Sequence, residues 1–301
     1  MEMLAKTEAM QFLVDILELN NIEEILNYDD KVNAVEAIMD AYREKEPFQN
    51  ISLMSVDFDK RSRPSWTEIK NAIFLKQGGL CYSHHIFLFA LFKALGFHVS
   101  LGTGGVTGPN NHVVLFFKDV CIQGDVYLLE AAIGLPSFHL ISLDFEHESP
   151  VYRDSFLEYK YIKHGGKILR MHRKGDPRPN FVKERDINVD GWTRFYDFEI
   201  ADTQNIEDFN DDYDAVYTDP QITHFHSSFH FIIFINRKAF IAHNTNILTE
   251  NDENELEKIE SETNEEIIRF MRNLTSSIDE STIRLALGNY KDTKRRVTSK
   301  N

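Results

Sequence analysis

A cysteine follows a pair of glycines just before a long apolar run. The glycines are Gly78 and Gly79, Cys81 comes two residues later, and the apolar run is 86–95. Glycine lets the backbone turn tightly and lets a ligand approach closely, and the run is long enough for a buried helix. A thiol at a helix N-terminus is favoured as the thiolate, the form that attacks an acyl carbon. Cys81 is therefore a candidate nucleophile, and the alternative is a buried, unreactive cysteine at a helix start.

A histidine and a glutamate further along the chain could support this cysteine. His112 opens a predicted strand over 112–118, and Glu130 closes another over 125–130. A thiol nucleophile needs a proton acceptor, and an imidazole needs a carboxylate on its other nitrogen to fix its tautomer. The sequence therefore predicts a triad of Cys81, His112 and Glu130 with the carboxylate within hydrogen-bond distance of the ring.

The geometry of the hairpin between these two strands decides whether the triad can form. Side chains alternate along a strand, so the histidine and the glutamate share a face only if paired residue numbers sum to an even value. A two-residue turn at 123–124 would make the sum odd and separate them. We therefore predict a loop of odd length, such as 120–124, or a bulge between Lys118 and Val126.

Two other features could suggest a metal or nucleotide site. His84 and His85 follow the cysteine by three and four residues and could be ligands or bases, but the chain has neither a CxxC nor an HExxH motif. We therefore expect no metal. The glycine-rich stretch 102–109 lacks the lysine and hydroxyl of a P-loop and is interpreted as a turn.

Composition limits the class of protein. The 301 residues carry a net charge of −15, which argues against a nucleic-acid-binding protein because phosphates need a basic surface. Two cysteines give no disulfide framework, the N-terminus has no secretory pattern, and no apolar stretch approaches a membrane span. We expect a cytoplasmic monomer that does not bind membranes.

The periodicity of the chain predicts an α+β fold in three parts. These parts are a helical bundle over 1–96, an antiparallel β-barrel over 97–205, and an α/β lid with a polar tail over 206–301. Within them we expect a helix that starts with a capping box at Ser65 and Glu68, a hairpin that turns at Asn236 and Arg237, an acidic helix over 253–274, and a disordered tail over 291–301. The remaining expected strands are 138–143, 152–162, 167–173 and 192–200.

Several short motifs, in the same order, resemble the arylamine N-acetyltransferase family. They are Pro47-Phe48-Gln49-Asn50, Gln77-Gly78-Gly79-Leu80-Cys81, a histidine that opens a strand, the segment from Tyr127 to Pro136, and Ile206-Glu207-Asp208-Phe209 followed by Pro220 and Phe225. The likeness spans about residues 5 to 250. The chain departs from the family pattern where Gln77 replaces an arginine, Ser83 and His85 replace Glu and Asn, and Glu130 replaces an aspartate.

This resemblance implies a cysteine-protease-like core and a ping-pong reaction. Acetyl-CoA would acetylate Cys81, and an arylamine or hydrazine would then take the acetyl group. By position relative to the family motifs, Phe48, Val106, Ile133 and Phe225 would line the acceptor pocket. Residues that contact the cofactor would be Gly105, Thr107, Gly108 and Thr223. Two alternatives remain open: a papain-like or transglutaminase-like hydrolase with the same triad, and a non-catalytic ligand-binding protein on the same fold.

Overall fold

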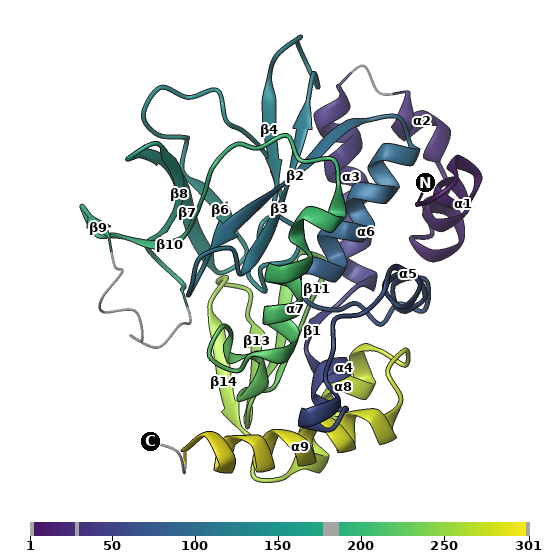
Figure 1. The fold of residues 1–301 in the computed structure, drawn as a ribbon, viewed down its shortest axis with the longest axis vertical. Helices are drawn as coiled ribbons and strands as arrows, with labels where there is room; N and C mark the ends of the chain where they lie inside the picture. The colour runs from purple at the N-terminus through teal and green to yellow at the C-terminus, as the bar shows by residue number, and fades with distance from the viewer. Residues whose placement is uncertain (1–2, 28–29, 177–186, 299–301) are drawn as a thin grey trace.

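The computed structural model describes residues 3–27, 30–176 and 187–298, and it begins with a group of helices around one buried helix (Figure 1). The central helix α6 (Cys81–Ala94) is buried from its first residue to Phe92, because its long apolar run leaves no polar face. Around it lie α1 (Lys6–Gln11) with a π-helical turn (Phe12–Ile16), α2 (Ile22–Leu26), α3 (Lys31–Lys45) and α5 (Trp66–Phe74). The short helix α4 (Ile51–Met54) instead packs against the last helix, α9 (Glu280–Thr298), and a 3-10 turn (Phe58–Lys60) follows it. The predicted capping box of α5 is confirmed, since Ser65 and Glu68 each bond the other's backbone N–H.

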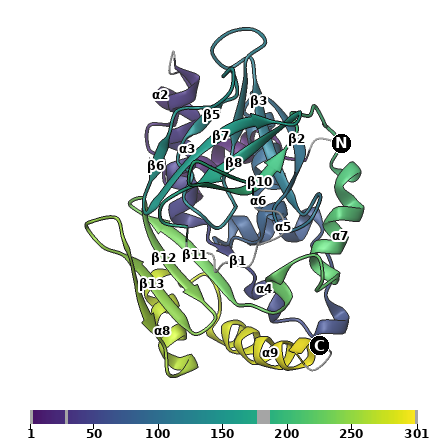
Figure 2. The same cartoon turned by 90° about the vertical axis from the view of Figure 1, so that its left-hand side faces the viewer.

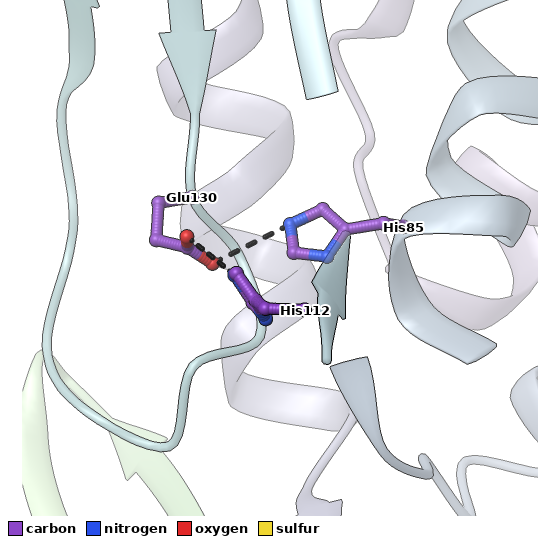
Figure 3. Close-up of side chains that lie close together, drawn as sticks. All are labelled: His85, His112 and Glu130. Carbon is purple, nitrogen blue, oxygen red and sulfur yellow. Dashed lines mark hydrogen bonds and ion pairs between the residues drawn. The ribbon is translucent and has the colours of Figure 1, made fainter. Parts of the chain in front are cut away.

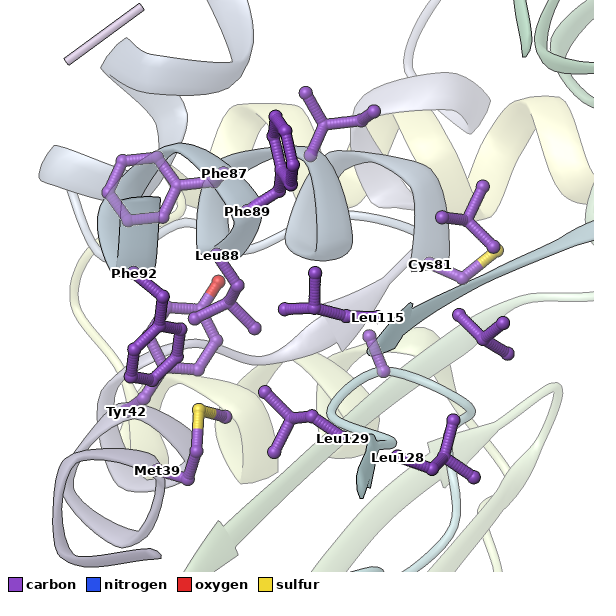
Figure 4. Packing of buried hydrophobic residues seen from close by; sticks show 14 of the residues in the cluster. Met39, Tyr42, Cys81, Phe87, Leu88, Phe89, Phe92, Leu115, Leu128 and Leu129 are labelled. Carbon is purple, nitrogen blue, oxygen red and sulfur yellow. The ribbon is translucent and has the colours of Figure 1, made fainter. Parts of the chain in front are cut away.

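A curled antiparallel sheet of nine strands follows and packs its inner face on α6. Its order is β5-β4-β3-β2-β10-β8-β7-β6, with β9 beside β10, so it forms a half-barrel. Aromatic and leucine side chains from α6, α3 and strands β3 and β4 interlock at this contact (Figure 4). The strands are β2 (His98–Gly105), β3 (His112–Lys118), β4 (Val126–Leu129), β5 (Leu140–Ser142), β6 (Tyr152–Asp154), β7 (Leu157–His164), β8 (Lys167–His172), β9 (Asn188–Val189) and β10 (Trp192–Phe198).

A second sheet of five strands forms the last part of the molecule, below the first in Figures 1 and 2. Its order is β1 (Phe48–Gln49), β11 (His230–Ile235), β12 (Lys238–His243), β13 (Asn246–Glu250) and β14 (Leu256–Glu260). Helices α8 (Asn264–Leu274) and α9 (Glu280–Thr298) pack against this sheet, and α7 (Asn210–Thr218) crosses beside α6, flanked by 3-10 turns (Ile206–Phe209 and His224–His226). The predicted hairpin is confirmed, because Ile235 pairs with Lys238 across Asn236 and Arg237.

Four expectations about the elements are wrong in part. The single strand expected over 152–162 is a hairpin, because Ser155 takes a φ of +55° and turns β6 back along β7. The glycine-rich turn is shorter than expected, since β2 continues through Gly105. The acidic segment 253–274 starts as strand β14, which pairs with β13 and leaves Ile259 exposed before α8 begins. Helix α9 runs to Thr298, where we expected a disordered tail, and residues 299–301 lie outside the described part.

The second sheet contains a strand from the beginning of the chain, and this strand connects the fold to the site. Phe48 pairs with Ile232, and Phe48 also forms a parallel bridge with Gly79. The segment around β1 therefore lies between β11 of the second sheet and the loop that precedes α6. Among the described residues, no helix has the length and apolar character needed to cross a lipid bilayer.

Candidate active site

The turn before Cys81 is held by the segment that contains β1. Gly79 donates its N–H to the Pro47 carbonyl at 3.2 Å and accepts the Gln49 N–H at 2.9 Å. Gly78 has a φ of +65°, and a Cβ at this position would lie 1.8 Å from the Pro47 oxygen, so no other residue fits. The predicted glycine turn and helix start are confirmed, because α6 begins at Cys81 and this residue therefore stands in the first turn, where backbone N–H groups have no intrahelical partner.

The hairpin between β3 and β4 has the register that the triad needs. Lys118 pairs with Val126, so the sums are even, and the connection from Asp119 to Asp125 has an odd number of residues, as predicted. The Asp125 carboxylate fixes this loop by accepting three backbone N–H groups, those of residues 120, 121 and 122. His112 is therefore diagonal to Glu130 on one face of the sheet.

The His112 ring and the Glu130 carboxylate meet in a buried site (Figure 3). His112 Nε2 and Glu130 Oε2 are 2.8 Å apart, with exposed fractions of 2% and 0% for the two side chains. Burial alone would lower the pKa of His112, but the Glu130 carboxylate and the Cys81 thiol, which hydrogen-bonds the same ring, raise it to about 10. Burial would raise the pKa of Glu130, but His112 lowers it to about 2. The two groups form an ion pair at neutral pH, and Nδ1 is the nitrogen left for the thiol.

A second imidazole contacts the other oxygen of the carboxylate. His85 Nε2 lies 3.5 Å from Glu130 Oε1 (Figure 3). The same nitrogen accepts the Ala131 N–H at 3.2 Å, and Nδ1 lies 3.1 Å from the Cys81 carbonyl oxygen. Burial lowers the pKa of His85 to about 4, although Glu130 opposes this. His85 is therefore neutral, with Nδ1–H donating to the carbonyl. It ties the start of α6 to the segment after β4.

These three residues form the one cluster with metal-ligand spacing among the described residues, since ligand atoms of His85, His112 and Glu130 lie within 4.8 Å of one another. Both His85 nitrogens and His112 Nε2 have protein partners, and the His–Glu contact is direct. A metal ion would have to displace these hydrogen bonds. The arrangement suits proton transfer better than metal binding.

Two residues around the carboxylate were not anticipated from the sequence. The fully buried Arg170 binds the Pro136 carbonyl and Ser137 Oγ and helps lower the pKa of Glu130, and Tyr196 packs its ring against His112 with centroids 5.4 Å apart. An arginine within the apolar strand β8 is the signal that could have revealed the first. Both residues shape a low-dielectric environment that strengthens the ion pair.

Two of the substitutions relative to the family pattern have hydrogen-bond partners in this chain. Gln77 Nε2 donates to the Ser277 carbonyl at 3.0 Å, so the side chain ties the glycine turn to the connection between α8 and α9. Ser83 Oγ lies 3.2 Å from the Tyr217 hydroxyl of α7. Both substituted side chains are therefore held by segments from the last third of the chain.

The expected acceptor residues are partly brought together. Phe48 and Phe225 contact each other edge to face, with ring centroids 5.8 Å apart, and a Cβ on Gly134, next to Ile133, would lie 3.2 Å from the Phe48 ring. Val106 donates its N–H to Asn111 Oδ1 at 2.9 Å. The structure thus brings Phe48, Phe225 and the segment of Ile133 together.

The expected cofactor residues surround Asn111. The Asn111 amide donates to Thr107 Oγ1 at 2.7 Å and to the Ile222 carbonyl at 3.3 Å, which joins the loop of Gly105, Thr107 and Gly108 to the segment of Thr223. Thr107 is exposed and Thr223 is buried, with its hydroxyl 3.5 Å from the Val216 carbonyl. The four residues therefore line two adjoining loops.

Comparison with known proteins places the chain in a family. A family model described as N-acetyltransferase matches residues 31–276. The arylamine N-acetyltransferase of Nocardia farcinica is 16% identical with a TM-score of 0.70, covering 93% of each chain. The Mycobacterium marinum enzyme in complex with CoA is 18% identical with a TM-score of 0.69, and the match covers 91% of this chain and 96% of that one. The Salmonella typhimurium enzyme is 14% identical with a TM-score of 0.65, and the match covers 90% of this chain and 98% of that one. No curated protein matches the sequence significantly. Because the family model covers most of its length, the chain belongs to the arylamine N-acetyltransferase family of acyltransferases.

Proposed function

We propose that the protein transfers an acetyl group from acetyl-CoA to the nitrogen of an arylamine or hydrazine through a thioester on Cys81. Family membership supports the overall reaction, and the relative solved with CoA supports the donor. The observation that carries the residue assignment is the buried His112–Glu130 ion pair beside the thiol at the start of α6. Buried titratable groups with strongly shifted pKa values occur preferentially at catalytic sites, which favours this assignment over a non-catalytic binding protein.

In the first half-reaction Cys81 is the nucleophile. His112 is cationic at neutral pH, and a positive imidazole next to a thiol favours the thiolate. The thiolate attacks the acetyl carbonyl of acetyl-CoA, the bond from that carbon to the CoA sulfur breaks, and the leaving thiolate takes the proton from His112. The products are acetyl-Cys81, a neutral His112 and free CoA.

In the second half-reaction the amine is the nucleophile. Its nitrogen attacks the thioester carbon, the bond to the Cys81 sulfur breaks, and His112 accepts the proton that the nitrogen loses. This restores the thiolate and the imidazolium. Glu130 holds the ring through Nε2 in both half-reactions, so that Nδ1 faces the sulfur.

The binding roles follow the loops around the triad. Gly105, Thr107, Gly108 and Thr223 would contact the CoA moiety where Asn111 joins their two loops. Phe48, Ile133 and Phe225, together with Val106, would form the acceptor pocket, because a flat aromatic amine is held mainly by apolar area. Both cysteines are free thiols, which suits a reducing compartment. The proposal therefore includes a cytoplasmic enzyme that acts as a monomer.

The two cysteines provide a matched pair for the test. Intact-mass spectrometry after mixing with acetyl-CoA should give an adduct of about 42 Da on the wild type and on Cys121→Ser, and none on Cys81→Ser. Cys121 is exposed in the β3–β4 loop, whereas Cys81 is buried in the site. Transient acetylation followed by release to water alone would indicate a hydrolase. No adduct on folded wild type would indicate the non-catalytic binding protein.

A further inference from the structure

A cavity of about 310 Å³ lies between α3 and the turn of the β11–β12 hairpin. Its walls carry two arginines, two acids, an amide and two aromatic rings, which are Asp40, Arg43, Glu44, Phe138, Phe234, Asn236 and Arg237. Among the described lining residues, none belongs to the triad or to the proposed cofactor and acceptor sets. The volume is that of a small-molecule site.

Arg43 is a buried cation with unused donors at this cavity. Its side chain is 5% exposed, and neither terminal nitrogen has a hydrogen-bond partner among the described residues. The nearest carboxylate oxygen, Asp40 Oδ1, is 3.8 Å from Nη1 and is itself without a partner among them. A buried guanidinium without hydrogen bonds is costly, and its planar fork matches a carboxylate. An anionic group that reached Arg43 would supply the partners that these two buried nitrogens lack.

Arg237 stands at the edge of the same cavity in an unusual conformation. It has a φ of +60° in a hairpin turn where glycine is preferred, and its guanidinium binds Asp40 Oδ2 at 2.6 Å. The guanidinium carbons of Arg237 and Arg43 lie 5.4 and 5.6 Å from the centre of the Phe138 ring. The hairpin thus has an arginine at a turn position whose backbone conformation favours glycine.

The lining charges specify the ligand. Asp40 is shared, because its Oδ2 binds Arg237 and its Oδ1 lies 3.8 Å from Arg43. The unused hydrogen-bond donors of Arg43 and the carboxylate of Glu44, which accepts the Asn236 N–H at the partly exposed rim, remain for a ligand. A molecule with one carboxylate and one ammonium group matches this pair, and an apolar body matches Phe138 and Phe234. We propose that this cavity binds a small zwitterion with an aromatic or aliphatic side chain, the chemistry of an apolar α-amino acid.

Isothermal titration calorimetry on the full chain tests the site with four probes: phenylalanine, 3-phenylpropionate, phenethylamine and inorganic phosphate. We expect phenylalanine to bind best, because each of the others lacks one of the groups that the walls recognise. Arg43→Leu should weaken phenylalanine binding by at least about tenfold, since a hydrogen-bonded charge is lost. Arg153→Leu, which removes an arginine that is 77% exposed on β6, is the matched control and should leave the affinity for phenylalanine unchanged.

A second variant keeps the test valid if Arg43→Leu does not fold. Arg237→Gly restores the residue that the turn prefers, so it should fold at least as well as the wild type while weakening phenylalanine binding. No binding of phenylalanine by the folded wild type, equal binding of phosphate, or unchanged binding in Arg237→Gly and Arg43→Leu would overturn the proposal. So would competition between phenylalanine and an arylamine acceptor, because it would place the ligand in the acceptor pocket.

Discussion

Replacing Glu130 by glutamine should remove the carboxylate that keeps the His112 ring positively charged at neutral pH. The Glu130 carboxylate lies 2.8 Å from the ring and, with the thiol, raises the pKa of His112 from 6.5 to about 10 in a fully buried position. At about 1.36 kcal/mol for each pKa unit, this is a preference for the charged ring on the order of 5 kcal/mol. Without the carboxylate, burial is the main remaining effect, so the pKa of His112 should fall below 6.5.

The assay for this prediction has two readouts. Titration of His112 by NMR in histidine-labelled Glu130→Gln should show the lower pKa, and the rate of Cys81 acetylation at neutral pH should fall by about 10² to 10⁴. Glu130→Asp is the matched control, because it keeps the charge, and it should retain a charged His112 and most of the rate. A His112 that still titrates near 10 in the folded glutamine variant would refute the reasoning.

The same ion pair fixes the pH dependence of stability. The charged His112 ring contributes fully to the free energy of unfolding below pH 6.5, and this contribution is lost as the pH rises toward about 10. The Glu130 carboxylate contributes fully above pH 4.5, and this contribution is lost as the pH falls toward about 2. The contribution of the pair to the free energy of unfolding, measured by urea titration, should therefore be largest between pH 4.5 and 6.5. In Glu130→Gln the alkaline decline due to His112 should disappear, and its persistence would assign it to other groups.

Two further substitutions test the loop and the pocket. Gly78→Ala should lower the free energy of unfolding by more than about 3 kcal/mol, because the added Cβ meets the Pro47 oxygen. Gly124→Ala is the control, since Gly124 has a φ of +89° but open space around it, and it should lower the free energy of unfolding by about 1–2 kcal/mol in the same denaturant titration. Similar values for the two variants would contradict the role of the clash. Ile133→Phe should change the preference among arylamines, measured as kcat/KM ratios, far more than the rate of acetylating Cys81, and equal effects on both half-reactions would argue against its place in the acceptor pocket.

Features governed by local rules could be predicted from the sequence. Side-chain alternation states which register of β3 and β4 lets His112 and Glu130 share a face, so the expected triad predicted the even register that the structure has. The capping box at Ser65 and the glycine turn before Cys81 depend on neighbouring residues in the same way. These features required only the chain on either side of them.

Features that depend on distant partners could not be predicted. The acidic stretch that becomes β14 has charges suited to a helix surface, but pairing with β13 overrides that preference. The contact of His85 with Ala131 joins residues 46 positions apart, and the burial of Arg170 depends on carbonyl and hydroxyl partners from another segment. Such partners are set by the tertiary fold, and no periodicity in one segment indicates them.

The strand β1 has a consequence for the order in which the protein matures. Asn50 donates to the carbonyls of Phe225 and Ser228 and accepts the His230 N–H, and these partners leave the ribosome about 180 residues after Asn50 itself. Domains generally fold from the N-terminus during synthesis, but this segment, which holds the turn before Cys81, has no second sheet to join until β11 has been made. The segment that holds the turn before the thiol is therefore completed late in translation, after α1 to α7 and the curled sheet have been synthesised. A nascent chain that stops before β11 would present the cysteine without its completed active site.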